Sequence, residues 1–315
     1  MNSFGRIFKL TDYGDTHGEA MGGIIEGCPA GVFIDIEFIQ NELTRRAPSF
    51  DSFSTQRKET DLVHFTSGIT NHCTTGAPIA FFIPNVDVQT NTETINVIKP
   101  SHASYTYHKK YGCENNIGCG RASARQTVCR VVAGAIAKLI LKPYLIHIET
   151  SVKTRGHSKK EEDTIGAIVA GSIKNLPAGL GEPVYDKFHA RLGYAMLSIN
   201  AAKGFEIGKG YAAAEMCGSQ YNDIQNPDFS FQTNHDGGVQ AGITNGEEVY
   251  FTVAFKPIPT LQIEQKTITF NGEFVHYTGN KRNDKCVVPR VLPVVEAMAA
   301  LVTVDFLLLN KAYKR

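Results

Sequence analysis

The chain has 315 residues, of which 42% are hydrophobic and 20% charged, a balance typical of globular proteins that bury a sizeable core and unlike that of disordered chains. Its 32 lysines and arginines nearly cancel 31 aspartates and glutamates, so the net charge of +1 supplies no overall field for holding nucleic acid or a membrane surface. Any anion-binding site must therefore be local. No repeat or linker marks a boundary, and we predict one domain over residues 1–315.

Cysteine usage and hydropathy predict a cytoplasmic protein. The seven cysteines are scattered without a C-x-x-C pair, which indicates neither a zinc site nor a disulfide framework and favours a reducing compartment. The first ten residues lack the apolar run of a signal peptide. Charged residues interrupt both long apolar runs, 131–141 and 291–309, so no membrane segment is expected.

Apolar periodicity predicts helices and strands that alternate irregularly along the chain. In chain order, the expected helices cover 35–46, 123–141, 188–201 and 289–309. Asp35 is a suitable N-cap for the first, and Pro289 suits the first turn of the last. Runs rich in β-branched and aromatic residues predict strands at 62–65, 78–83, 145–152, 164–173, 249–255 and 261–270. The pattern indicates an α/β fold that is not a regular barrel.

Two glycine-rich or polar segments carry a histidine. Residues 14–18 set His17 between glycines, and residues 99–112 set His102 among small residues and lysines. An accessible imidazole titrates near neutral pH, as a general acid requires. Taken singly, each segment is more typical of an ordinary surface loop with a hydrogen-bonded histidine.

Three further segments combine cations with tight turns. Residues 118–125 place two arginines at the start of a predicted helix, where free N–H groups favour phosphate, although the third glycine of a dinucleotide fingerprint is absent. Residues 234–246 form a glycine-rich loop ahead of the strand at 249–255, which residues 256–260 follow, and residues 281–286 precede the last helix. Each is also compatible with a simple connection.

The order and spacing of these segments resemble the chorismate synthase family from near Phe4 to the end of the chain. Residues 11–31 resemble its T-x-x-G-E-S-H-G opening, residues 74–79 its T-T-G-x-P-I segment, and residues 198–204 its S-I-N-A-x-K-G segment. The regions around Lys256 and Arg282 resemble its K-P-x-x-T and R-H-D-P motifs.

The resemblance implies a single-domain α/β sandwich with a central helical layer between sheets, usually assembled as a homotetramer. It implies reduced flavin mononucleotide (FMNH2) as cofactor and the trans-1,4-elimination of phosphate from 5-enolpyruvylshikimate 3-phosphate to give chorismate, the last step of the shikimate pathway. A flavin that lends and regains an electron suits an elimination without net oxidation. Either this chain or a separate flavin reductase supplies the reduced flavin.

The resemblance also assigns roles by position. His17 corresponds to the histidine that protonates the flavin, His102 to the acid that assists the departing phosphate, and Asp284 to the carboxylate near flavin N5. The expected flavin contacts are Arg121, Ala122, Ser123, Asn200, Ala201, Ala241, Lys256, Pro257, Ile258, Pro259, Thr260 and Arg282. The expected substrate contacts are Arg45, Arg46, Arg125 and Thr16, since guanidinium groups bind phosphate and carboxylate in a bidentate manner.

Several positions depart from the family pattern, and they support an alternative. Lys99 and Ser104 stand where the family has arginine and aspartate, Ala47 and Ser52 replace arginines, and residues 114–117 lose two cations. Asn283 and Lys285 replace a histidine and a proline around Asp284, Asp15 and Thr16 are milder changes, and the chain is short between about 152 and 161. A degenerate relative that binds FMN or a phosphorylated ligand without turnover is therefore the alternative. A nucleic-acid-binding module is disfavoured by the neutral charge.

Overall fold

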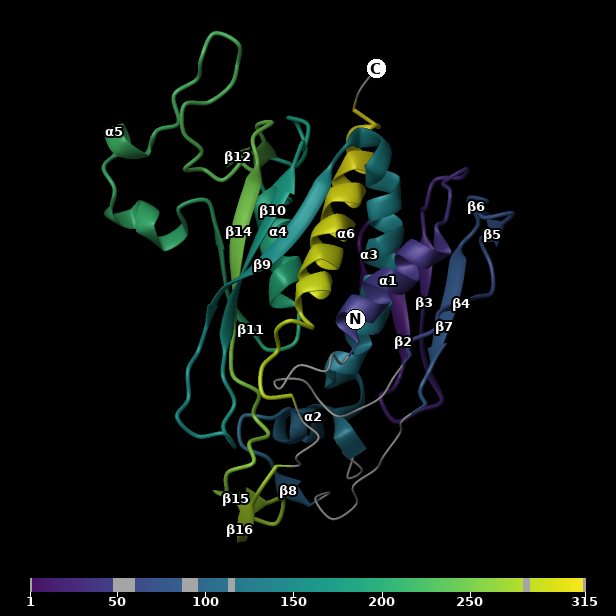
Figure 1. Cartoon of the computed structure of the whole chain (residues 1–315), viewed down its shortest axis with the longest axis vertical. Helices are drawn as coiled ribbons and strands as arrows, with labels where there is room; N and C mark the ends of the chain where they lie inside the picture. Colours follow the sequence, from purple (N-terminus) through teal and green to yellow (C-terminus); the bar gives the residue numbers. More distant parts are fainter. Residues whose placement is uncertain (1, 48–59, 87–95, 113–116, 280–283, 314–315) are drawn as a thin grey trace.

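Two antiparallel sheets enclose a layer of helices (Figure 1). The computed structural model describes residues 2–47, 60–86, 96–112, 117–279 and 284–313, with no side-chain description for 117–119. The five-stranded sheet has the order β1 (Ser3–Phe4), β2 (Lys9–Gly14), β3 (Ala20–Glu26), β7 (Ile79–Pro84), β4 (His64–Phe65). The four-stranded sheet has the order β11 (Ala202–Ile207), β14 (Val249–Phe255), β10 (Ala167–Lys174), β9 (His147–Arg155). The expected α/β fold with helices between sheets is confirmed.

Each sheet turns one face to the helices because its strands alternate in burial. In β7 the side chains of Ile79, Phe81 and Ile83 are buried, and the residues between them are half-buried. The β14 strand alternates in the same way over its whole length, and Val253 pairs with Val169 of β10. A period of two places every second side chain on the core face. A slip of one residue would therefore move these apolar side chains to the opposite face of the sheet.

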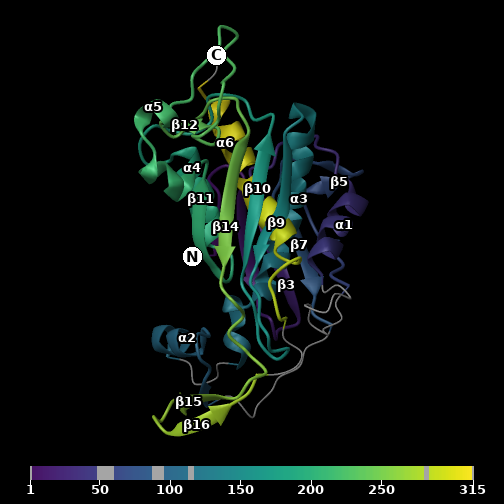
Figure 2. The same ribbon diagram turned by 60° about the vertical axis from the view of Figure 1, so that its left-hand side comes forward.

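The longer helices are α1 (Ile36–Arg46), α3 (Thr127–Leu141), α4 (Phe188–Leu197) and α6 (Leu292–Asn310), with α2 (Ser104–Tyr111) and α5 (Gly218–Tyr221) outside the layer. The α6 helix packs on α3 and on β9 and β10, whereas α3 packs on β2 and β3 (Figures 1 and 2). Asp35 caps α1 as predicted, since its Oδ1 accepts the Phe38 N–H at 3.0 Å.

The apolar character of α6 follows from its position in the middle of this layer. Within the described residues it is the one helix long and apolar enough to span a bilayer, yet 83% of its most apolar window is buried inside the protein. A helix that is hydrophobic on all sides needs such surroundings. The α3–α6 contact is close at Gly134, where an added Cβ would lie 2.3 Å from Ala297 Cβ.

The predicted element boundaries hold to within a few residues, with two corrections. The helix predicted from Pro289 begins at Leu292, and Pro293 occupies its first turn instead. The helix predicted from Ser123 begins as a 3-10 turn, η3 (Ala124–Gln126), which Ser123 caps.

Short pieces complete the structure. They are the three-stranded sheet β16 (Phe274–Tyr277), β15 (Gln265–Thr269), β8 (Val97–Ile98), the pairs β5 (Ile69–Thr70) with β6 (Cys73–Thr74) and β12 (Val239–Gln240) with β13 (Ile243–Thr244), and the 3-10 turns η2 (Ile117–Ala122), η4 (Lys142–Tyr144) and η5 (Gly210–Glu215).

Candidate active site

A pocket of about 650 Å³ lies where loops from distant parts of the sequence meet at one end of the helical layer. Ligand pockets in proteins typically have volumes of about 300–1,000 Å³. Its wall includes the following residues of the predicted site: Arg46, His102, Ala122, Ser123, Asn200, Ala201, Lys256, Ile258, Pro259, Thr260 and Asp284. The structure thus brings together four of the polar segments and the segment that follows α4.

Hydrogen bonds join three of these segments directly. The Asn200 side-chain amide donates to the Ala122 carbonyl at 2.8 Å, and the Lys256 N–H donates to the Ala201 carbonyl at 3.0 Å. Ala201 holds a left-handed backbone with φ of 66°, a conformation that costs a non-glycine residue free energy. Surrounding contacts must stabilise this turn, which presents both residues to the pocket.

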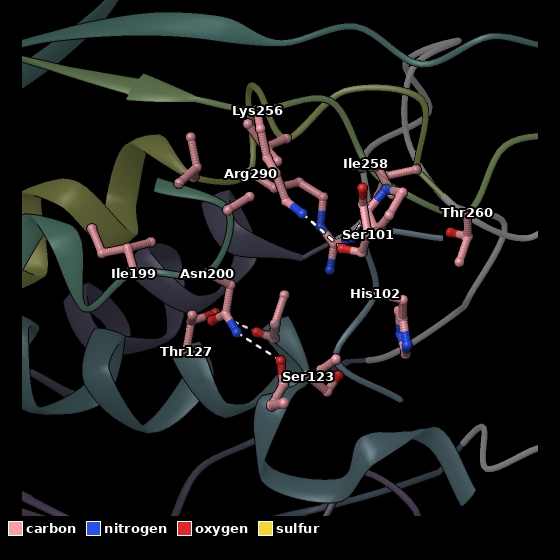
Figure 3. A pocket seen from close by; sticks show the side chains of 18 of the residues that line it. Ser101, His102, Ser123, Thr127, Ile199, Asn200, Lys256, Ile258, Thr260 and Arg290 are labelled. Atoms are coloured by element: carbon pink, nitrogen blue, oxygen red, sulfur yellow. Dashed lines mark hydrogen bonds and ion pairs between the residues drawn. The ribbon is translucent and has the colours of Figure 1, made fainter. Parts of the chain in front are cut away.

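The histidine loop forms another wall. The Lys256 ammonium donates to the Ser101 carbonyl at 2.8 Å, and Figure 3 shows His102 beside Ser101. Ser104 accepts the Lys99 N–H on its hydroxyl at 3.2 Å and closes the loop around His102. The serine that replaces the family's aspartate therefore still has an acceptor role here.

The His102 imidazole is neutral at pH 7. Burial, together with the positive charges of Lys99 and Lys256, lowers the pKa of His102 from 6.5 to about 4. Its Nδ1 accepts the Ser104 N–H at 3.2 Å, which places the proton of the neutral ring on Nε2. A bound anion would raise this pKa, because an opposite charge favours the imidazolium.

A buried cluster of arginines stands behind the pocket wall. The Arg46 Nη2 lies 2.7 Å from Asp61 Oδ2, and Arg125 Nη1 pairs with the other oxygen of the same carboxylate. Burial lowers the pKa of Arg46 to about 10, which leaves the group charged at pH 7. Its Nε is buried and has no hydrogen-bond partner among the described residues.

Sequence reasoning missed Arg290, which also lines the pocket. Its Nη1 pairs with Asp284 Oδ2, and its Nε donates to the Arg46 carbonyl at 3.1 Å. Arg290 thereby joins the predicted catalytic carboxylate to the end of α1. The available signal was a cation six residues after Asp284, immediately before the last helix.

Arg45 is directed away from the pocket into an ion network between helices. It contacts Glu296 and Glu42, and Lys138 Nζ lies 2.6 Å from both carboxylates. Although burial favours the neutral acid, Arg45 and Lys138 lower the pKa of Glu296 to about 2. The structure therefore places only the second residue of the Arg45–Arg46 pair on the pocket wall.

His17 and Thr16 lie in the turn between β2 and β3, beside the pocket but not on its wall. The Thr16 hydroxyl donates to the Gly120 carbonyl at 3.1 Å, two residues before the wall residue Ala122. Asn85 donates to the carbonyls of Asp15 and Gly18 and accepts from Arg125 Nε at 3.0 Å. The first histidine loop is thus fastened to the arginine cluster.

The remaining predicted contacts lie elsewhere. Arg121 pairs with Asp12 and lines a neighbouring cavity of about 630 Å³, which shares Ala103 and Ala122 with the pocket. Pro257 is exposed and is not a wall residue. Ala241 sits in the turn between β12 and β13, and Figure 1 shows β12 at the opposite end of the molecule from α2, which follows the His102 loop. Arg282 lies outside the described residues, as do Ser52 and residues 114–116.

Comparisons with known proteins match this architecture. The sequence model of the family described as chorismate synthase matches residues 8–159 and 156–308. A chorismate synthase from Christiangramia forsetii is 47% identical over 350 aligned positions, covering 99% of both chains, and one from Flavobacterium psychrophilum is 46% identical. A crystal structure of a chorismate synthase superposes with a TM-score of 0.76 at 28% identity and covers 98% of this chain and 93% of that one.

The chain has an α/β sandwich fold, a cation-rich pocket between loops, and relatives named chorismate synthase. Together these define the class of protein as a lyase. Near-complete coverage at this identity leaves the family in no doubt. The chain belongs to the chorismate synthase family.

Proposed function

We propose that the chain converts 5-enolpyruvylshikimate 3-phosphate to chorismate, with FMNH2 as cofactor, in the cytoplasm. The observation that carries the proposal is one pocket wall made of His102, Asp284, the Asn200–Ala201 turn and the residues 256–260. These segments are distant in sequence and meet only in the folded chain. Chorismate synthase activity is the activity named for relatives that match this chain over 98–99% of their own length.

The pocket suits a flavin together with a small phosphorylated acid. Its volume is within the usual range for such ligands, and Ile199, Ile258, Pro259 and Tyr277 supply apolar surface for a planar ring. The guanidinium of Arg46 and the ammonium of Lys256 supply positive charge on the wall for acidic groups. When bound, reduced flavin supplies the reversible electron donation that the elimination requires.

The chain's own residues then bind, orient and move protons. Arg46 and Lys256 attract the phosphate and carboxylates, and electrostatic stabilisation of a leaving phosphate is a large contribution to such rates. When the anion binds, His102 takes up a proton on Nδ1, which ends the acceptance of the Ser104 N–H by that atom, and the imidazolium then donates its Nε2 proton to the departing phosphate. Asp284, which pairs with Arg290, is assigned the role of accepting a proton in the elimination. His17 retains its proposed role toward the flavin.

The alternative, a relative without turnover, is not favoured. The replacement at Ser104 preserves its bond to the Lys99 N–H, and the Lys99 side chain remains a cation on the wall. The family's other two catalytic positions, His17 and Asp284, are also filled by the expected residue types.

The test is an anaerobic assay with purified chain, reduced FMN and 5-enolpyruvylshikimate 3-phosphate, following phosphate release and chorismate absorbance. We expect equal amounts of both products and no net oxidation of the flavin. Flavin binding without either product would reject the proposal. A parallel assay with oxidised FMN and a nicotinamide donor would show whether this chain reduces its own flavin or needs a separate reductase. Sedimentation velocity would test the proposed homotetramer.

A further inference from the structure

Asp61 is a buried carboxylate that touches the arginine cluster without lining the pocket. Its side chain is fully buried, and its backbone adopts a left-handed φ of 48°. A non-glycine residue in this conformation is held there by its surroundings at a cost in free energy. Placing a charge at such a site is also unfavourable unless strong partners compensate.

The two oxygens of Asp61 are divided between two guanidinium groups. Oδ2 accepts from Arg46 Nη2 at 2.7 Å, and Oδ1 accepts from Arg125 Nη1. Although burial alone would raise it, the charges of Arg46 and Arg125 lower the pKa of Asp61. The carboxylate is therefore ionised and bonded on both sides.

The cations around it repel one another. Arg125 and Arg290 both lower the pKa of Arg46, which measures the repulsion that Arg46 experiences. Arg46 itself belongs to the pocket wall, and Arg125 sits in η3 between the wall residues Ala124 and Thr127. Without a shared anion, these guanidinium groups would move apart and Arg46 would lose its orientation on the wall.

We propose that Asp61 is the positioning residue of the pocket's anion site: it fixes Arg46 on the wall beside Arg125 and so sets the affinity for the phosphate and carboxylate groups of the substrate. The inference rests on the proposed function for the identity of the substrate only. The anion site itself can be probed with inorganic phosphate.

The experiment measures the Kd of inorganic phosphate, and of 5-enolpyruvylshikimate 3-phosphate with oxidised FMN present, by calorimetry on the full chain. Asp61→Asn keeps the shape but removes the charge, and we expect it to weaken both affinities about tenfold or more, with KM rising more than kcat falls. Asp61→Glu keeps the charge but moves the carboxylate by one methylene group. The Asp61→Glu variant replaces Asp61→Asn in the experiment if the latter does not fold. We expect it to lose less affinity for both ligands than Asp61→Asn.

Glu296→Gln is the matched control. Glu296 is also a buried carboxylate shared by two cations, Arg45 and Lys138, but it does not line the pocket or touch Arg46. We expect this variant to melt at a lower temperature than wild type and to keep the wild-type Kd for both ligands.

Folded Asp61 variants that bind both ligands within about twofold of wild type would overturn the inference, as would an equal loss in Glu296→Gln. A wild-type chain that binds phosphate but forms no chorismate would reject the proposed function and leave the Asp61 comparison valid. A wild-type chain that binds neither ligand would overturn both.

Discussion

The most informative single residue is His102, because its surroundings oppose the role proposed for it. An acid that assists phosphate departure must carry a proton, yet burial and two lysines lower the pKa of His102 to about 4. Under the proposed function the substrate resolves this conflict, since its phosphate brings the negative charge that favours protonation. Protonation is thus coupled to the presence of the leaving group.

This coupling predicts proton uptake when 5-enolpyruvylshikimate 3-phosphate binds near pH 7. Calorimetry in buffers of different ionisation enthalpy measures the number of protons taken up. We expect that number to be positive in wild type and to fall in His102→Gln, and unchanged uptake in the variant would refute the assignment.

The same pKa predicts how stability depends on pH. The unfolded chain binds a proton at His102 below its ordinary pKa of 6.5, whereas the folded chain binds it only near pH 4. The unfolded state therefore gains protons first as pH falls, and the free energy of unfolding drops between these values by up to about 3 kcal/mol. Above pH 6.5 the contribution is constant. Denaturant titrations of wild type and His102→Gln across this range would measure the difference.

Removal of either imidazole should affect turnover more than flavin binding. We expect His102→Ala and His17→Ala each to lower kcat by about a hundredfold to ten-thousandfold, as loss of a general acid typically does, with little change in the Kd of FMN. Rapid-mixing assays and flavin fluorescence measure the two quantities. Wild-type rates in His17→Ala would show that its place outside the pocket wall excludes it from the chemistry.

Arg290 is predicted to position Asp284. Arg290→Gln removes the ion pair, and we expect kcat to fall about tenfold to a hundredfold because the carboxylate loses its fixed orientation. Arg290→Lys should recover part of the loss by restoring the charge without the second donor that Nε gives to the Arg46 carbonyl. Arg6→Gln breaks a surface pair with Asp186 and is the control that should leave kcat unchanged. Equal kcat in Arg290→Gln and wild type would contradict the role.

At the scale of elements, the helical layer depends on the close contact of α3 with α6. The contact requires glycine at position 134, since a Cβ there would lie 2.3 Å from Ala297 Cβ and 2.4 Å from its Cα. The ion network of Arg45, Lys138, Glu42 and Glu296 joins the same helices to α1.

Gly134→Ala should therefore destabilise the protein. Alanine favours a helix over glycine by about 1 kcal/mol, but overpacking against α6 backbone costs about 1–3 kcal/mol or more, and the clash should win. Gly218→Ala in α5 is the control, because nothing lies within 4 Å of its added Cβ. Chemical denaturation would measure both, and a Gly134→Ala variant as stable as wild type would refute the close contact.

The connection between β9 and β10 is shorter than in relatives and contacts the segments that line the pocket. The family match divides at residues 156–159, and the alignment with the Christiangramia relative has 350 positions against 315 residues here. Relatives therefore carry residues that this chain lacks. The short connection still supports the pocket, because the Thr164 hydroxyl donates to the Ile258 carbonyl at 2.7 Å and the Ile165 N–H to the Lys285 carbonyl at 3.0 Å.

At the scale of the whole molecule, the buried core and the residues of the candidate site lie in different parts of the fold. The sheets and helices supply one continuous buried core, and the polar loops that interrupt them gather at one end of the helical layer. Because these loops lie outside the core, polar or strained residues in them reduce the stability of the core little. Ser101 and Ala201, both with a left-handed backbone, are examples. The glycine-rich turn that carries Ala241 lies at the other end and forms no part of this pocket.

The local elements were predictable from sequence because period and capping are local properties. The strand at 249–255 and the Asp35 cap follow directly from alternation and from a side-chain oxygen at the right position. The strands β2 and β3 were missed because their glycines and charged residues hide the alternation. Motif resemblance identified the family and 11 of the 23 residues that line the pocket.

Only the tertiary structure decided which charges face the ligand. Arg45 and Arg46 are adjacent and alike in sequence, yet one enters an ion network between helices and the other enters the pocket wall, because neighbouring residues on a helix point about 100° apart. The pairing of Asp61 with two arginines and of Arg290 with Asp284 depends on contacts between segments far apart in the chain. Residue types and their order establish which chemistry is available, and packing establishes which groups perform it.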